Sequence, residues 1–378
     1  MHTFQGIGTM SGTSMDGLDI ACCTFEVEGD TYRFSLDYGE TIPFDDKWRS
    51  RLLHLWEQSA ETYAKTHVYL GHWMGEQIQA FVQRHGLKPD FVAVHGQTIF
   101  HQPEKNFTAQ IGDGETLATY LTCPLVTNFR NKDIALGGEG APLIPIGEHY
   151  LFPDYRLFLN LGGIANVTFG SRAFDVCACN LVLNEVYRRA WPEGPGYDDH
   201  GRQAAGGTLI PELLAALDAL PYFRQPPPKS LGWEWVTQAV LPLLDIFPAD
   251  PADQLHTFVH HVAGQIAQAL RLLAAPPGPL LITGGGRHHT FLLEQIRTAI
   301  APMGITVDEA TPTAWVDYKE AIVFAFLGLR TLTGRTTTLA SATGARQDAV
   351  TGSIHLPPDG GWQVLSRTWS SFDPLPET

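Results

Sequence analysis

The sequence predicts an α/β protein with two like domains that face one cleft. Residues 4–27 and 155–170 each have the pattern of a strand, a glycine-rich turn and a second strand. In each half a later buried strand ends in a polar or glycine-rich turn, at residues 91–98 and 280–286. The repetition indicates a duplicated unit. A single large sheet with incidental glycine turns is the alternative, and the pattern alone does not separate the two.

Helices are expected between these strands. Residues 61–85 and 251–273 carry apolar side chains at helical spacing. Residues 173–180, "AFDVCACN", predict the end of a further strand. An insertion near residues 190–235 accounts for the greater length of the second half, and its stretches "WPEGPGYDDHGRQAAGG" and "QPPPKS" predict loop.

Composition limits the classes of partner. With 378 residues, the chain is long enough for two domains. Its formal net charge of -15 opposes binding to nucleic acid or to anionic membranes. The sequence has no apolar run that would span a bilayer and no signal-peptide pattern. Its five cysteines fit neither a disulfide framework nor a CxxC pair, so we expect a cytoplasmic protein.

The stretch "GTMSGTSMDGLD", residues 8–19, has the composition of a phosphate-binding turn. Its backbone N–H groups and hydroxyls can cradle phosphate oxygens. Asp16 and Asp19 can hold Mg²⁺, usually through water, and the metal then bridges to the phosphates. The stretch has no lysine and precedes a strand, so it is not a Walker loop. The alternative is a hairpin turn in which Gly17 supplies a positive φ, but this leaves the two aspartates unexplained.

These residues resemble the first phosphate motif of the anhydro-N-acetylmuramic acid kinases, in the sugar kinase, Hsp70 and actin superfamily. Further stretches resemble that family's motifs, in order, over nearly the whole chain: "HGQTIFHQP", "NFRNKDIALGGEGAPLIP", "NLGGIANVTF", "PPPKSLG", "ITGGG", "KEAIVFAFLG" and "ATGARQD". The resemblance implies two duplicated actin-like (ribonuclease H-like) domains around an ATP cleft, ATP and Mg²⁺ as cofactors, and a homodimer.

The expected domains are residues 1–140 and 141–378. The glycine- and proline-rich stretch 136–146 is the expected hinge. The C-terminal tail, "WSSFDPLPET", either stays peripheral or packs back on the first domain.

The family's activity implies a specific reaction. The chain would open the anhydro ring of 1,6-anhydro-N-acetylmuramic acid and phosphorylate the freed O6, giving N-acetylmuramic acid 6-phosphate in cell-wall recycling. One carboxylate can then suffice as the base for water, because the γ-phosphoryl group traps the leaving oxygen. Asp175, at the end of a predicted strand, matches the family's base. The alternative is that Asp175 caps the helix that follows.

The resemblance also assigns binding residues. Arg130 would pair with the lactyl carboxylate of the sugar, although a surface salt bridge is the alternative. Asp133 would orient Arg130 or a sugar hydroxyl. Glu320 either binds a hydroxyl or favours a helix dipole. Gln97 and Thr98 match further sugar-contacting positions, or simply form a turn. The positions assigned to ATP and its phosphates are Gly12, Thr13, Ser14, Met15, Asp16, Gly17, Leu18, Asp19, Asn160, Gly162, Gly163, Gly284, Gly285 and Gly286.

The sequence departs from the family at "FDVCACN", where "FDTGPGN" is usual. The segment 176–179 thereby loses a hydroxyl and two glycines beside the expected base. His288 and His289 also replace the usual small and Asn residues near the adenosine-side glycines. Two alternative functions stay open: a kinase of another small sugar, and a non-catalytic ATP-driven switch. Catalytic use of Cys177 and Cys179 is a less favoured alternative.

Overall fold

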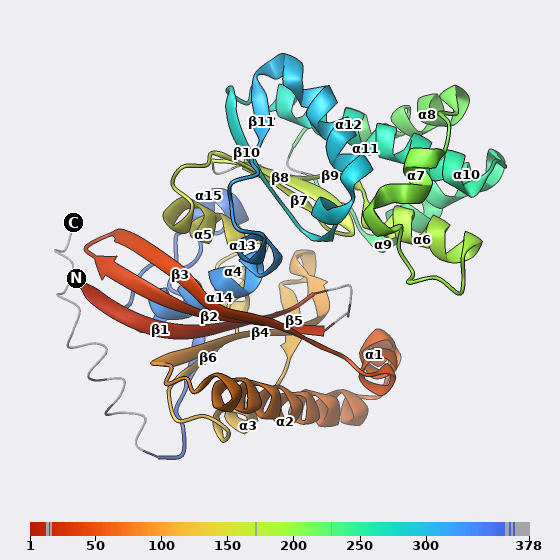
Figure 1. The fold of residues 1–378 in the computed structure, drawn as a ribbon. Helices are drawn as coiled ribbons and strands as arrows, with labels where there is room; N and C mark the ends of the chain where they lie inside the picture. The colour runs from red at the N-terminus through yellow and green to blue at the C-terminus, as the bar shows by residue number, and fades with distance from the viewer. Residues whose placement is uncertain are drawn as a thin grey trace. The chain divides into compact units, whose positions relative to one another are not determined.

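The computed structural model describes residues 1–12, 15, 17–170, 172–227, 229–359, 363 and 366. It divides into two compact units, each a mixed α/β structure around one sheet (Figure 1). Unit 1 contains Met1–Pro153 and the described residues from Tyr318 onward, and unit 2 is Asp154–Asp317. The division differs from the expected one, because residues 141–153 and the end of the chain join the first unit.

Unit 1 is built on a sheet in the order β12-β6-β4-β1-β2-β3, with β5 paired to β4. Strand β2 runs antiparallel to both β1 and β3. Strand β4 runs parallel to β1, and β6 runs parallel to β4. The elements are β1 His2–Ser11, β2 Gly17–Glu28, β3 Thr31–Pro43, α1 Asp46–Leu53, α2 Ala60–His85, β4 Phe91–Gln102, β5 Phe107–Ile111, α3 Gly114–Ala118, β6 Leu125–Thr127, α4 Asn131–Ala135, α5 Ile144–Leu151, α14 Lys319–Leu332, α15 Ala340–Thr343 and β12 Ser353–His355.

Helices α2 and α14 cover opposite faces of this sheet (Figure 1). Alternation along β1 sends Ile7 into the core beneath α2 and Gly8 toward α14. A Cβ on Gly8 would lie 2.0 Å from the carbonyl oxygen of Ala321 and 2.4 Å from the amide nitrogen of Ala325. Helix α14 therefore approaches β1 so closely that only glycine fits at this position.

Helix α5 explains why residues 141–153 belong to unit 1. Glu148 of α5 accepts a 2.7 Å hydrogen bond from Lys319 of α14, and both side chains are buried. Phe152, just after α5, packs edge-on against Phe34 of β3, with ring centroids 5.6 Å apart. A buried ion pair that loses one partner is strongly destabilised, so these contacts fix α5 to the first unit.

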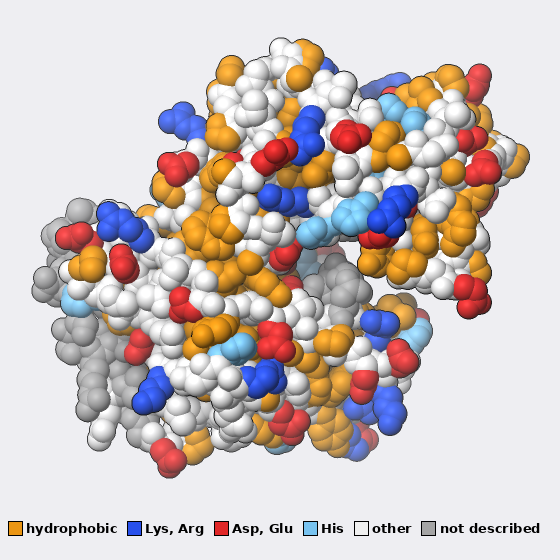
Figure 2. Space-filling view, in the orientation of Figure 1, with side chains coloured by type: hydrophobic (Ala, Val, Ile, Leu, Met, Phe, Trp, Pro, Cys, Tyr) orange, Lys and Arg blue, Asp and Glu red, His pale blue; other side chains and the backbone are white. Residues whose placement is uncertain are grey.

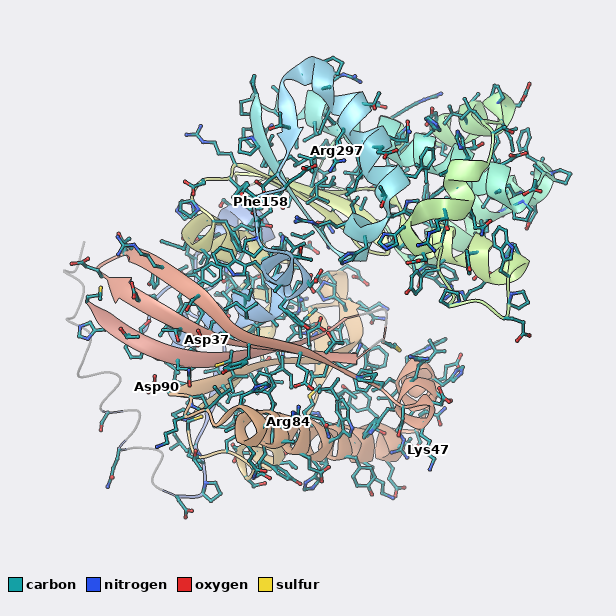
Figure 3. All side chains as sticks on the ribbon, viewed as in Figure 1. Asp37, Lys47, Arg84, Asp90, Phe158 and Arg297 are labelled. Carbon is teal, nitrogen blue, oxygen red and sulfur yellow. The ribbon has the colours of Figure 1, made fainter. Side chains whose placement is uncertain are left out.

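Polar contacts link strands of this sheet to one another and to α2 (Figure 3). The backbone N–H of Gln5 donates to Asp90 at 2.8 Å, and its side chain donates to Asp37 at 3.3 Å. Arg84 of α2 donates to Glu40 of β3 at 2.7 Å. These contacts bridge elements far apart in sequence.

Unit 2 repeats the strand order of unit 1. Its sheet runs β11-β10-β7-β8-β9, with β7, β8 and β9 antiparallel, β10 parallel to β7, and β11 parallel to β10. The order β6-β4-β1-β2-β3 of unit 1 has the same directions. Two duplicated actin-like units are thus confirmed, and the single-sheet alternative is wrong. The elements are β7 Leu157–Leu161, β8 Ile164–Phe169, β9 Arg172–Ala178, α6 Asn180–Ala190, α7 Arg202–Gly206, α8 Pro211–Asp218, α9 Trp233–Trp235, α10 Leu241–Ile246, α11 Pro251–Leu272, β10 Gly278–Thr283, α12 Thr290–Ile300, β11 Ile305–Val307 and α13 Thr313–Asp317.

The prediction of loop is wrong for part of the first stretch, where α7 forms. The insertion near 190–235 also contains α8 and α9. Leu213 and Leu217 of α8 are fully buried in the core of unit 2, together with Tyr222 and Phe223. Burial of these side chains stabilises helices that the glycine and proline content obscured.

The surface agrees with a protein that carries charges of both signs. Figure 2 shows acidic and basic side chains interspersed on the visible face of each unit. Among the described residues, no helix is long and apolar enough to cross a membrane.

The contact between β1 and α14 gives a stability prediction. Gly8→Ala is expected to lower the free energy of unfolding by about 3 kcal/mol, at the upper end of the usual range for overpacking, because the new methyl group meets backbone atoms. Gly264→Ala in α11 is the control. No atom lies within 4 Å of the position that its new Cβ would take, and replacing a helical glycine gains about 0.5–1 kcal/mol. Urea unfolding of both variants measures the difference; equal stability would contradict the packing described.

Candidate active site

Arg130, which precedes α4, is held by two neutral acceptors in unit 1. Its Nε donates to Nε2 of His95 at 2.9 Å, and its Nη1 donates to the carbonyl of Gly140 at 2.7 Å. Since a guanidinium only donates, His95 must accept at Nε2 and donate from Nδ1 to the carbonyl of Gly96 at 2.8 Å. Burial and the nearby Arg130 lower the pKa of His95 well below its usual value, so the imidazole is neutral.

The guanidinium of Arg130 is charged and available to an anion. Burial lowers its pKa to about 10, which Glu320 partly opposes, and this still leaves it protonated at neutral pH. Within the described part of the chain, no carboxylate lies within ion-pair distance of Arg130. The surface salt bridge considered from the sequence is therefore absent there.

Glu320 lies in the first turn of α14, as expected. Burial raises the pKa of its carboxyl; Lys319 and Arg130 lower it, and Glu148 raises it. A half-buried carboxyl with a raised pKa, beside an arginine, is typical of a functional site. The sequence expectation that Glu320 can bind a sugar hydroxyl stays a prediction.

Asp133 does not contact Arg130 directly. Its fully buried carboxylate accepts from the backbone N–H of Gly140 and from the hydroxyl of Thr343, both at 2.8 Å. The carbonyl of Gly140 in turn accepts from Arg130. Asp133 thus positions Arg130 through Gly140, and both of its oxygens are already used within the protein.

Gln97 lies within β4 rather than at its end, and it supports the first glycine-rich turn. Its side chain is fully buried, accepts from the hydroxyl of Ser11 and donates to the carbonyl of Gly12 at 3.4 Å. Thr98, also within β4, accepts from Gln110 at 3.3 Å. The expectation that Gln97 and Thr98 end their strand is wrong, because β4 continues to Gln102 along β5.

The first glycine-rich turn is described only in part. Thr13, Ser14 and Asp16 lie outside the described residues. Among the described residues of the turn, Met15 has a left-handed conformation, with φ of 54°, and Gly17 does not. A Cβ on Gly17 would instead lie 2.3 Å from a carbonyl oxygen of β3, so close strand approach requires this glycine.

The other positions of this turn differ in accessibility. Leu18 is fully buried in the core, so its side chain is not available to a ligand. Asp19 is half-buried on β2 and accepts from Thr41 at 2.6 Å. Among the described residues no group of three or more potential ligands could hold a metal ion. Because Asp16 lies outside the described residues, the expectation that Asp16 and Asp19 hold Mg²⁺ stays a prediction.

A polar row crosses the sheet of unit 2. Asp175 of β9 pairs with Asn166 of β8, which pairs with Asn160 of β7, which pairs with Thr283 of β10. Directly paired residues project to the same face of a sheet. With neighbouring strands about 4.8 Å apart, Asp175 and Asn160 are on the order of 10 Å apart. Asp175, the expected base, and Asn160, which precedes the second expected phosphate turn, therefore lie in one row across the sheet.

Asp175 lies in the middle of β9, which corrects the expectation of a strand end. The register of β8 and β9 shifts beside it, so that Val176 forms a β-bulge, a device that redirects neighbouring side chains. Asp175 also does not cap α6, since that helix begins five residues later and has no side-chain cap. The capping alternative is wrong.

The segment 229–231 holds Asp175 in place. The backbone N–H of Asp175 donates to the carbonyl of Lys229 at 3.1 Å, and its Oδ2 accepts from the N–H of Leu231 at 2.9 Å. The hydroxyl of Tyr222 donates to the Asp175 carbonyl at 2.5 Å. Burial raises the pKa of the Asp175 carboxyl, and the Leu231 N–H partly opposes this. Oδ1 makes no hydrogen bond to the described residues, so it is available to a water molecule.

The glycines of unit 2 fall into two groups. A Cβ on Gly163, Gly284 or Gly286 would lie 2.9, 2.4 or 2.7 Å from a neighbouring atom, so the fold itself requires these three. A Cβ on Gly162 or Gly285 would meet nothing closer than 3.5 or 3.8 Å. The fold does not explain glycine at these two positions, whereas close approach of a nucleotide would.

Comparison with known proteins decides the family. A sequence model of the family described as "Anhydro-N-acetylmuramic acid kinase" matches residues 4–357. The chain belongs to this family. Anhydro-N-acetylmuramic acid kinases of Coxiella burnetii and Xylella fastidiosa are 36% and 34% identical to it, and each match covers 92% of this chain and 96% or 95% of the relative. Membership makes the protein a phosphotransferase with an alcohol group as acceptor.

Two solved structures show distant likeness to this chain. The ROK hexokinase of Thermus thermophilus is 13% identical with a TM-score of 0.36, over 86% of this chain and 99% of its own. Component A of the (R)-2-hydroxyglutaryl-CoA dehydratase of Acidaminococcus fermentans is 11% identical with a TM-score of 0.42, over 84% and 99%. Likeness at this level supports no statement about function.

The departure from the family at residues 176–179 is a packing change. Cys177 and Cys179 are fully buried in the hydrophobic core of unit 2. Burial raises the pKa of the Cys179 thiol to about 12 and raises that of the Cys177 thiol well above its usual value. A buried thiol of this kind is neither a nucleophile nor a base at neutral pH, which argues against catalytic use of the two cysteines.

Sequence reasoning missed the structural roles of three residues. His95 opens the "HGQT" motif, but the geometry that makes it an acceptor for Arg130 depends on the fold. Asn180 donates to the Leu161 carbonyl at 2.8 Å and so links the end of β9 to the second glycine turn. His289 accepts from the Leu292 N–H at 3.1 Å and caps α12, a structural role at a position of family departure.

The burial of the thiols gives a test. Cys22, Cys23, Cys123, Cys177 and Cys179 are all buried and free, so none is expected to react with Ellman's reagent in the native protein at neutral pH. All five should react after unfolding in guanidinium. Rapid reaction of one or two thiols in the folded protein would contradict the packing of the 176–179 segment.

Proposed function

We propose that this kinase hydrolyses the anhydro ring of 1,6-anhydro-N-acetylmuramic acid and transfers the γ-phosphoryl group of ATP to O6. The product would be N-acetylmuramic acid 6-phosphate, formed in cell-wall recycling. The row Asp175–Asn166–Asn160 is the observation that carries the proposal. In this row Asp175 and Asn160, which precedes the expected phosphate turn, lie on the order of 10 Å apart, and a separation of this size supports a sugar bound between the base and ATP.

In this proposal Asp175 is the base. Its free Oδ1 accepts the proton of a water molecule that attacks the anomeric carbon. The bond between the anomeric carbon and O6 breaks, and O6 attacks the γ-phosphorus. The bond from this phosphorus to the β,γ-bridging oxygen breaks and ADP leaves, so no acid is needed for the leaving sugar oxygen. The raised pKa makes Asp175 a stronger base than an exposed aspartate, while Leu231 keeps its carboxylate oriented.

The glycine turns would bind ATP. The backbone at Gly162 and Gly285 has room for close approach, and Asn160 lies between these turns in the polar row. Asp19, with Asp16, would hold Mg²⁺ through water; the ion neutralises charge on the transferring phosphoryl group. Gly12, whose carbonyl is fixed by Gln97, would position the first turn.

Arg130 and Glu320 would recognise the sugar. Arg130 has an unengaged Nη2 and no ion-pair partner among the described residues, which suits the lactyl carboxylate. Glu320 would hydrogen-bond a sugar hydroxyl. His95 accepts from Nε of Arg130 and the Gly140 carbonyl accepts from Nη1, while Asp133 holds Gly140 in place. These three residues would therefore position the guanidinium.

We also propose that the enzyme is a homodimer and works in the cytoplasm. The family resemblance supports the dimer. The free, buried thiols and the use of ATP support the compartment.

Acceptor dependence tests the proposed function. ADP release with Mg-ATP should need 1,6-anhydro-N-acetylmuramic acid and stay near background without sugar or with N-acetylglucosamine. Mass spectrometry should show a product heavier by one phosphoryl group and one water. Slow ADP release that ignores the sugar would instead indicate an ATP-driven switch, and turnover with another sugar alone would indicate a different sugar kinase.

The pH dependence of kcat tests the role of Asp175. Protonated Asp175 cannot accept a proton, so kcat falls as pH falls through its pKa in the complex. Because burial raises this pKa, the acid limb should lie above the ordinary aspartate range near about 4. Circular dichroism at each pH controls for unfolding. An acid limb at or below the ordinary range would contradict the assignment.

Arg130→Lys tests recognition of the carboxylate. Lysine keeps the charge but loses the planar fork, so KM for the anhydro sugar should rise about tenfold or more, with little change in KM for ATP. Arg84→Lys, on the surface of α2, is the control and should leave both unchanged. Unaltered sugar KM in Arg130→Lys would remove Arg130 from the sugar site.

A further inference from the structure

A basic cavity opens to the surface of unit 2, beside the segment that holds Asp175, and its Arg224 and Arg271 are exposed. It has a volume of about 490 Å³ and is lined by β9, the C-terminal half of α11 and residues 223–229. Phe174 and Val176, the neighbours of Asp175 in β9, line it, whereas Asp175 does not. The cavity includes part of the "PPPKSLG" motif, to which the proposed function gives no ligand.

The charge of this cavity is opposite to that of the protein. Arg224, Lys229 and Arg271 line it, and none of its lining residues is acidic, although the chain carries a net charge of -15. Asp218 is outside the lining, and its carboxylate accepts from His261 and Gln265. Three cations without a facing carboxylate attract an anion of high charge.

Few contacts within the protein engage the side chains of these three cations. Among the described residues, Arg224 and Arg271 form no ion pair and no side-chain hydrogen bond. Lys229 donates only to the carbonyl of Tyr222, at 3.2 Å, and lies 4.3 Å from the centre of the Tyr222 ring. Burial lowers the pKa of Lys229, as expected for an ammonium held against aromatic rings without a carboxylate partner.

The remaining lining residues define the rest of the ligand. The side-chain amides of Gln265 and Gln268 can hydrogen-bond hydroxyls, and Phe174 and Phe223 offer apolar ring faces. We propose that this cavity binds a phosphorylated monosaccharide as an effector: the phosphate on Arg224, Lys229 and Arg271, and the sugar ring against the aromatic and amide side chains. The product of the proposed function belongs to this class, but binding here does not depend on that function.

An occupant of the cavity would reach the base. The carbonyl of Lys229 accepts from the backbone N–H of Asp175, and two residues later Leu231 donates to its carboxylate. Tyr222, under the Lys229 ammonium, donates to the Asp175 carbonyl. Ligand bound at Arg224 and Lys229 would therefore fix the segment that orients Asp175, which links the effector cavity to catalysis.

Calorimetric titration with glucose 6-phosphate tests the proposal on the full chain, with a non-hydrolysable ATP analogue present to fill the nucleotide turns. One saturable site is expected. The double variant Arg224→Gln/Arg271→Gln should bind at least tenfold more weakly, and glucose without phosphate should bind at least tenfold more weakly to the unaltered protein.

Arg202→Gln, an exposed arginine of the same unit outside the cavity, is the matched control and should bind like the unaltered protein. Circular dichroism checks that the double variant folds. Absence of saturable binding, equal affinity in the double variant, or equal binding of glucose would each overturn the proposal. These outcomes are independent of whether the enzyme phosphorylates the anhydro sugar.

Discussion

A close contact between a helix and a strand in the first unit joins the beginning of the chain to its C-terminal part. Helix α14 lies against β1 at a distance that leaves no room for a Cβ on Gly8. The same helix brings Glu320 near Arg130 and packs Phe324 against His95, with ring centroids 4.7 Å apart. The geometry of the expected sugar-binding residues therefore depends on the approach of α14, and the Lys319–Glu148 pair fixes where that helix begins.

In the second unit, the Asp175 carboxylate is oriented without a neutralising cation. Asp175 receives a backbone N–H from Leu231 and no cation, so its pKa is raised by burial. A β-bulge at Val176 and the hydrogen bonds to Lys229 and Tyr222 fix the backbone around it. Backbone donors orient the carboxylate at little cost to its basicity, whereas an arginine partner would lower its pKa.

The sequence predicted the duplicated hairpin units and the two long helices, because glycine turns and helical periodicity are local signals. It predicted loop where α7 forms and did not predict α8, since the stability of α8 comes from burying Leu213 and Leu217 in a core that local composition does not reveal. It also placed Asp175 at a strand end, because a bulge leaves no mark in the residue pattern. The family resemblance implied that Asp133 orients Arg130, but neither its action through Gly140 nor the role of His95 could be predicted, because these depend on contacts between residues 10 and 35 positions apart in the chain.

The oxygen source of the anomeric hydroxyl tests the central claim most directly. The protein and its Asp175→Asn variant would be incubated with Mg-ATP and 1,6-anhydro-N-acetylmuramic acid in heavy-oxygen water, and the product weighed promptly, before the anomeric oxygen exchanges with solvent. The account predicts a phosphorylated product with one heavy oxygen at the anomeric position, and its loss in the variant. Undiminished labelled product from the variant would contradict Asp175 as the base.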